Sequence, residues 1–209
     1  MTDPNAPRVF RLRATFIERD RLAMLSHLEV AHALERTVRR AGLPFAVSQG
    51  FSPHMKIAFG AALPGGVGST CEIFDLQLRD YVAADKALAA LQQASVPDLM
   101  VQDCRYIENS APAASVAFPF STYEVRFDAP VSSIAVPESI TVVRKRKEKT
   151  LVVDEFLAEP FAFDGDRATF TLEAKPTGSL RPDVLLEHCD VSANIVSITR
   201  IAQQEALEG

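Results

Sequence analysis

The order of apolar patterns in the first 108 residues constrains the fold of this chain more than any other feature. Four runs are short and apolar or alternate apolar with polar side chains, as strands do, and two longer runs repeat apolar residues at helical spacing. In chain order they are a strand at residues 8–17, a helix at 26–41, strands at 55–59 and 70–78, a helix at 82–94 and a strand at 100–107. This order predicts an α+β unit in which an antiparallel sheet carries both helices on one face.

The helix expected at residues 26–41 has clear signals at both ends. Ser26 and Glu29 form the Ser-x-x-Glu pattern of a capping box, in which each side chain satisfies a backbone N–H of the other residue. Apolar residues then recur at intervals of three or four, and Gly42 is typical of the residue that follows a helix end.

The second half of the chain repeats this mixture less regularly. Residues 109–120, rich in alanine and proline, indicate a linker. Strands are expected at residues 123–127, 140–144, 151–153, 168–173 and 195–201, with a short helix at 182–189. The sequence therefore predicts a ferredoxin-like βαββαβ domain in residues 1–108, a linker at 109–120, and a second α+β subdomain in 121–209 that is either a degenerate ferredoxin-like unit or mostly β.

Composition excludes several classes of protein. No apolar run reaches the ~20 residues that a membrane helix needs, and residues 1–7 do not resemble a signal peptide. The three cysteines are scattered and form no C-x-x-C, while His27 and His32 are five residues apart, which is not the spacing of a helical metal pair. We therefore expect a cytoplasmic protein without a membrane partner, a metal site or a cofactor of its own.

The loop at residues 48–56 gathers hydrogen-bonding side chains around one aromatic residue. Gly50 and Pro53 set a turn, and Phe51 stands among the polar side chains of Ser48, Gln49, Ser52, His54 and Lys56. An aromatic platform beside such groups suits stacking on a base, and Lys56 suits a phosphate. The alternative, which the sequence leaves open, is an ordinary turn whose Phe51 ring packs into the core.

Three further segments are candidates for binding an anion. The basic side of the first helix presents Arg36, Arg39 and Arg40, the glycine-rich loop at residues 60–69 contains Gly65 and Gly66, and a basic turn holds Arg144, Lys145, Arg146, Lys147 and Lys149. The net charge of −5 argues against a general nucleic-acid binder, but residues 1–60 hold nine Lys and Arg against five Asp and Glu. A solvated helix face, a hairpin loop and a charged hairpin turn are the plain alternatives.

Several motifs of the first half together resemble a bacterial radical-SAM-associated domain of unknown function. They are Leu25-Ser26-His27-Leu28, the run from Ser48 to Ile57, and Phe59-Gly60-x-Ala62-Leu63-Pro64-x-Gly66; where similar chains have Asn-Pro-His, this chain has Ser52-Pro53-His54. The resemblance implies a radical SAM protein as partner and work on RNA or a ribonucleoprotein. Because the chain has no C-x-x-x-C-x-x-C, the iron–sulfur cluster and SAM are expected only in that partner.

The leading hypothesis is a non-catalytic accessory protein that docks RNA or another anionic substrate for a radical SAM enzyme. One alternative is a metal-independent endoribonuclease, like the CRISPR repeat-processing enzymes that the doubled fold resembles, using His54 and also His27 as acid and base. Another is a protein–protein adaptor without a ligand. The substrate-binding candidates are Ser26, His27, Arg36, Arg39, Arg40, Ser48, Gln49, Phe51, Ser52, His54, Lys56, Gly65 and Gly66, with the basic turn as a second patch.

Overall fold

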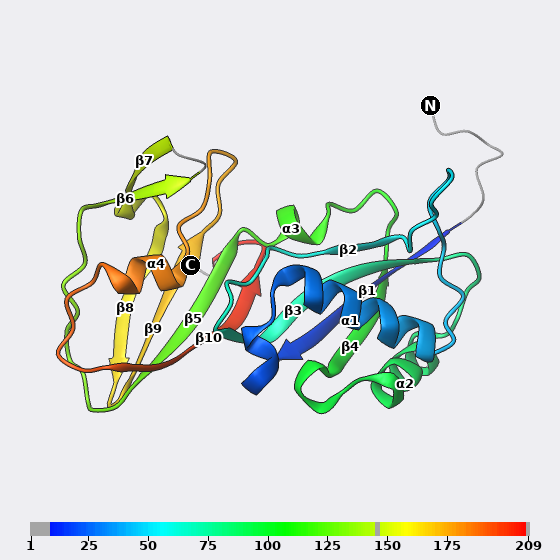
Figure 1. Cartoon of the computed structure of the whole chain (residues 1–209), viewed down its shortest axis with the longest axis horizontal. Helices are drawn as coiled ribbons and strands as arrows, with labels where there is room; N and C mark the ends of the chain where they lie inside the picture. Colours follow the sequence, from blue (N-terminus) through cyan, green and yellow to red (C-terminus); the bar gives the residue numbers. More distant parts are fainter. Residues whose placement is uncertain (1–8, 145–146, 208–209) are drawn as a thin grey trace. The chain divides into compact units, whose positions relative to one another are not determined.

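A computed structural model describes residues 9–144 and 147–207 of the protein (Figure 1). These residues form an α+β fold that is mostly β, with a mixed sheet of eight strands, a separate two-stranded hairpin and four helices. They divide into two compact units. Unit 1 comprises the chain up to Gly65 together with Cys71–Ala117, and unit 2 comprises Gly66–Thr70 together with the chain from Phe118 onward.

Unit 1 contains the strand and helix order that the sequence predicts. Its elements are β1 (Phe10–Glu18), α1 (His27–Arg40), β2 (Ile57–Phe59), β3 (Val67–Leu78, shared with unit 2), α2 (Ala84–Ala94), β4 (Val101–Ile107) and α3 (Ala114–Ala117), with 3-10 turns at Asp20–Met24 and Pro97–Leu99. The strands lie in the order β4-β1-β3-β2, and both outer pairs are antiparallel.

The predicted capping box at the start of α1 is confirmed. The Ser26 hydroxyl accepts from the backbone N–H of Glu29 at 3.4 Å, and the Glu29 carboxylate accepts from the backbone N–H of Ser26 at 2.8 Å. The hydrogen bonds to Ser26 lower the pKa of Glu29. Both residues are exposed, and their contacts cap the N-terminus of α1.

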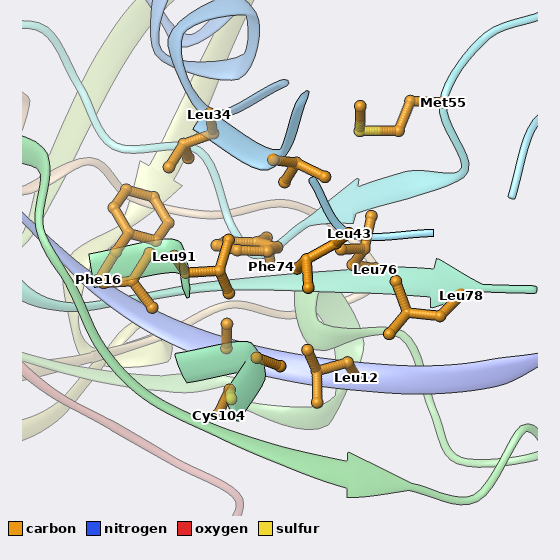
Figure 2. Packing of buried hydrophobic residues seen from close by; sticks show 14 of the residues in the cluster. Leu12, Phe16, Leu34, Leu43, Met55, Phe74, Leu76, Leu78, Leu91 and Cys104 are labelled. Carbon is orange, nitrogen blue, oxygen red and sulfur yellow. The ribbon is translucent and has the colours of Figure 1, made fainter. Parts of the chain in front are cut away.

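One hydrophobic core joins the two long helices to one face of the unit 1 sheet (Figure 2). Strands β1 and β3 alternate, so Leu12 and Phe74 point into this core while intervening side chains point away. Leu34 of α1 and Leu91 of α2 reach it from the helices and are fully buried. The core therefore fixes both helices on the same side of the strands.

On the opposite face of β1 and β3, buried charges form a closed network. Asp75 accepts from Arg13 at 2.7 and 2.9 Å and from Arg11 at 2.7 Å. The guanidinium groups also donate to the carbonyls of Ala111 and Pro112, at 2.6 and 2.9 Å. Burial opposes ionisation of Asp75, but the hydrogen bonds and charges of both arginines outweigh it and lower the pKa of this carboxyl.

Unit 2 is built around a sheet that starts from the first residues of β3. Val67–Ser69 pair in parallel with β10 (Ile195–Gln204), which is followed across the sheet by β5 (Phe120–Phe127), β9 (Arg167–Glu173) and β8 (Leu157–Asp164), all antiparallel. A hairpin of β6 (Ser139–Arg144) and β7 (Lys147–Val152), a 3-10 turn at Val153–Glu155 and the short helix α4 (Pro182–Glu187) complete it.

Two elements were not expected from the sequence. Strand β8 is half exposed and contains Pro160, so its alternation is weak. The segment expected as a linker contains α3 and supplies the carbonyls that bind Arg11 and Arg13. No helix in the described part of the chain is long and apolar enough to cross a membrane.

Candidate functional site

The loop at residues 48–56 is a pinned hairpin with an exposed tip. The backbone N–H of Ser48 donates to the carbonyl of His54 at 2.8 Å, and the N–H of His54 donates to the Ser48 hydroxyl at 3.0 Å. Met55 anchors the returning strand because its side chain is buried at the margin of the unit 1 core (Figure 2). Gly50, with a φ of 122°, permits the turn.

This anchoring leaves the tip of the loop in solvent. The Phe51 side chain is fully exposed, and His54, Gln49 and Ser52 are exposed as well. A large aromatic ring held in water at the tip of a fixed turn is available to stack on a partner. The ring is therefore not part of the core.

Next to the loop lies a hollow with a volume of about 330 Å³, here called the Phe45 hollow. It is lined by Val9, Phe45, Ala46, Val47, Gln49, Lys56 and Arg79. Backbone hydrogen bonds hold its wall together: Lys56 donates to Ala46 at 2.8 Å, Ala46 to Gln77 at 2.8 Å and Arg79 to Pro44 at 2.9 Å. Three paired chain segments therefore form most of the wall of the hollow, and Val9 completes its lining.

Three cations lie at the Phe45 hollow or against Phe45 itself. The Arg39 guanidinium lies 5.3 Å from the centre of the Phe45 ring and 3.7 Å from the Glu35 carboxylate. Arg79 lies 3.5 Å from Asp80, an exposed pair that water screens strongly. Lys56 is exposed and forms no ion pair within residues 9–144 and 147–207. Three cations and two carboxylates therefore leave one net positive charge beside the hollow, on the exposed Lys56.

Ser26 and His27 lie at the other end of α1. Fourteen helical residues separate the two ends by roughly 20 Å, at ~1.5 Å per residue. The His27 ring meets Phe59 edge to face, with ring centres 5.6 Å apart. His27 also lines a small cavity with the buried carboxylates of Glu18 and Glu72. Its volume of about 10 Å³ has room for about one water molecule, so it cannot take an organic substrate.

The three arginines on the basic side of α1 have different surroundings. Arg39 covers Phe45, whereas Arg40 donates to the Ala94 carbonyl of α2 at 2.7 Å. Arg36 is exposed on the helix surface. Only Arg39 among these three contacts a residue that lines the Phe45 hollow.

The remaining candidates lie elsewhere. Gly65 and Gly66 are exposed in the turn before β3 and do not line the hollow. Lys145 and Arg146 of the basic turn lie outside the described residues, while Arg144 ends β6 and Lys147 begins β7. The Lys149 amine donates to the Thr177 carbonyl at 2.8 Å within unit 2.

The thiols of buried Cys104 and partly buried Cys189 are poor nucleophiles. Burial, with a contribution from the charge of Asp103, raises the pKa of Cys104 to about 11, and burial raises the pKa of Cys189 to about 11. In the described part of the chain, no group of three or more His, Cys, Asp or Glu side chains is placed to hold a metal ion.

Several residues that line the Phe45 hollow were not predicted from the sequence. Phe45 and Val47 belong to a short apolar segment without polar groups that would mark a site, and Arg79 stands 23 positions after Lys56. The usable signal was the antiparallel order of β2 and β3, which brings the end of β3 back beside the segment after α1.

These features define a mostly β α+β protein with a prebuilt, cationic hollow beside an exposed aromatic loop. Residues 11–182 match the model of DUF2344, a family described as uncharacterized protein conserved in bacteria, and the chain belongs to this family. No curated protein matches it. Among solved structures, it is similar to an unknown protein from Galdieria sulphuraria at 12% identity and a TM-score of 0.31, over 90% of this chain and 99% of that one.

Proposed function

We propose that this protein is a cytoplasmic accessory protein that docks RNA or a similar anionic substrate for a radical SAM enzyme. The observation that carries the proposal is the cationic Phe45 hollow with the solvent-exposed Phe51 beside it on the same loop. Stacking on aromatic rings and phosphate contacts to Lys and Arg are the two interactions on which single-stranded nucleic acid binding depends.

The role as a docking protein follows from what the hollow offers. Lys56 and Arg79 are cations at its wall, and Phe51 adds stacking area. His54 carries the imidazole of the loop, the type of side chain most often used for general acid–base catalysis. The residues that line the hollow include neither a histidine nor a carboxylate that could serve as its catalytic partner. Binding without chemistry is therefore the simpler assignment.

The radical SAM partner and the ferredoxin-like fold belong to the same proposal. The motifs around Ser26, Ser48–Ile57 and Phe59–Gly66 support the partnership, in which the cluster and SAM are supplied by the partner chain. The strand order β4-β1-β3-β2, with α1 and α2 packed in one core, supports a ferredoxin-like unit 1. The free thiols of Cys104 and Cys189 are consistent with a reducing compartment.

The proposal is tested by the affinity of the full chain for a fluorescent single-stranded RNA of about one dozen nucleotides, a length within the site sizes of such proteins. The double variant K56A/R79A removes both cations of the hollow and is expected to weaken binding by at least about tenfold, from two lost phosphate contacts. The matched control K86A/R105A removes an exposed lysine and an exposed arginine from α2 and β4, and its affinity should stay close to wild type.

Cleavage and co-purification assays with the same chain distinguish the alternative functions. Cleavage of the RNA that persists in chelator and disappears in His54→Ala would select the ribonuclease. A chain that retains no RNA but co-purifies with an iron–sulfur protein would select the adaptor. Equal loss of affinity in K56A/R79A and in K86A/R105A would refute the Phe45 hollow as the docking site.

A further inference from the structure

The Phe45 hollow is large enough for one small ligand and no more. Its volume of about 330 Å³ lies at the lower end of the roughly 300–1,000 Å³ of small-molecule sites. Its wall is fixed by the backbone hydrogen bonds of Lys56, Ala46 and Arg79, so it does not need to be rebuilt on binding. A base pair or a folded RNA helix is too large to enter it, whereas a single unpaired nucleotide is not.

The apolar part of the lining is here called the floor of the hollow. Val9, Phe45 and Val47 line it, and Phe45 and Val9 are only half exposed. Apolar and aromatic surface of this kind gains free energy when it is covered by a flat ring, at about 25 cal/mol per Å² of apolar area. Arg39 lies over the Phe45 ring at 5.3 Å but does not itself line the hollow. The floor therefore suits a planar, weakly polar group.

The rim of the hollow is polar and positive. Lys56 supplies a mobile ammonium group, and Arg79 supplies a planar guanidinium that can bind two oxygens of one phosphate. Gln49 supplies an amide, which can donate and accept hydrogen bonds at the edge of a base. The ligand that matches both floor and rim has one flat heterocycle and one phosphate. The cationic sulfonium and ammonium groups of SAM do not match it.

We propose that the Phe45 hollow binds one unpaired nucleotide, with its base against Phe45 and Val47 and its phosphate between Lys56 and Arg79. This inference rests on the proposed RNA-docking function and specifies its substrate as single-stranded. Phe51, at the tip of the same loop, is then free to stack on an adjacent base.

The inference is tested with adenosine monophosphate, uridine monophosphate and adenosine as probes, by calorimetry and by competition against labelled single-stranded RNA. Both monophosphates should bind and displace the RNA, and adenosine should bind at least about tenfold more weakly because it has no phosphate for Lys56 and Arg79. Val47→Trp fills the hollow and keeps every charge. It should abolish monophosphate binding, whereas Val96→Trp, which changes a valine of similar exposure (41% against 44%) outside the hollow, should not.

Each outcome decides one level of the argument. Circular dichroism confirms that Val47→Trp is folded, and Lys56→Ala provides a second variant that leaves the hollow open. Monophosphate affinity equal to wild type in Val47→Trp, or no binding up to about 10 mM, which corresponds to less than about 3 kcal/mol, would overturn the nucleotide site. If the nucleotide site fails but K56A/R79A still weakens the binding of single-stranded RNA, the docking function stands without that site. If the wild-type protein binds no single-stranded RNA, both the docking function and the nucleotide site are refuted.

Discussion

The substitution Asp75→Asn probes the buried ion pairs that join β1 and β3 of unit 1. The Asp75 carboxylate is 3% exposed and receives three hydrogen bonds from Arg13 and Arg11, whose side chains are 6% and 11% exposed. Asparagine has nearly the same shape but no charge. The variant therefore removes the Asp75 charge from beside two guanidinium groups and changes the shape of the site little.

The magnitude follows from that loss. Breaking a buried ion pair by removing one partner costs about 3–5 kcal/mol, so Asp75→Asn should lower the free energy of unfolding of unit 1 by that amount. Asp80→Asn is the matched control, because the Arg79–Asp80 pair is 72% and 73% exposed and its loss should change stability by no more than about 0.5 kcal/mol. Guanidinium unfolding gives both values, and hydrogen exchange of β1 amides assigns the effect to unit 1.

The Asp75 carboxyl also makes the free energy of unfolding depend on pH, in a direction that follows from its lowered pKa. Because contacts with Arg13 and Arg11 lower the pKa of folded Asp75, the ionised group stabilises the folded state above its unfolded pKa. That contribution is lost as the pH falls through the folded pKa, so the stability gap between wild type and Asp75→Asn should narrow in acid. A gap below about 1 kcal/mol at neutral pH, or one that widens in acid, would refute the buried-network reasoning.

Three further predictions concern the fold and its thiols. Leu34→Ala empties a fully buried site between α1 and the sheet and should lower the free energy of unfolding by about 2–5 kcal/mol in denaturant unfolding, whereas the exposed Leu28→Ala should cost under about 0.5 kcal/mol. Ser26→Ala removes the N-cap of α1 and should cost about 1 kcal/mol by thermal unfolding, with equal stability of the variant counting against the cap. Since the pKa values of buried Cys104 and partly buried Cys189 are raised to about 11, mass spectrometry after alkylation at neutral pH should find both thiols reacting far more slowly than in denaturant, and Cys104 unmodified; rapid labelling of Cys104 in the native protein would contradict its burial.

The first half of the fold was predictable because local signals agree with the tertiary structure there. The Ser26–Glu29 capping box and the alternation of β1 each require only neighbouring residues to be recognised. The second half gave weaker signals. Strand β8 contains Pro160, and the parallel pairing of β10 with Val67–Ser69 joins residues about 130 positions apart, which no local pattern encodes.

The candidate site was predictable only in part, for a similar reason. The turn chemistry of Gly50 and Pro53 pointed to an exposed loop at residues 48–56, and Phe51 is exposed there. Helical periodicity placed Arg39 and Arg40 on one side of the helix. It could not show that Arg40 donates a hydrogen bond to α2 while Arg39 lies over the Phe45 ring. The contribution of Arg79 depends on the register of β3 against the chain after α1, and this register is set by the packed core.

The most direct test of the docking proposal is the salt dependence of single-stranded RNA affinity in wild type, Lys56→Ala and Lys86→Ala. Each phosphate contact contributes about 0.7 to the slope of log affinity against log salt concentration. The account predicts that Lys56→Ala lowers this slope by about one such contact, while Lys86→Ala leaves it unchanged. A slope near zero in wild type, or one that both variants lower equally, would contradict it.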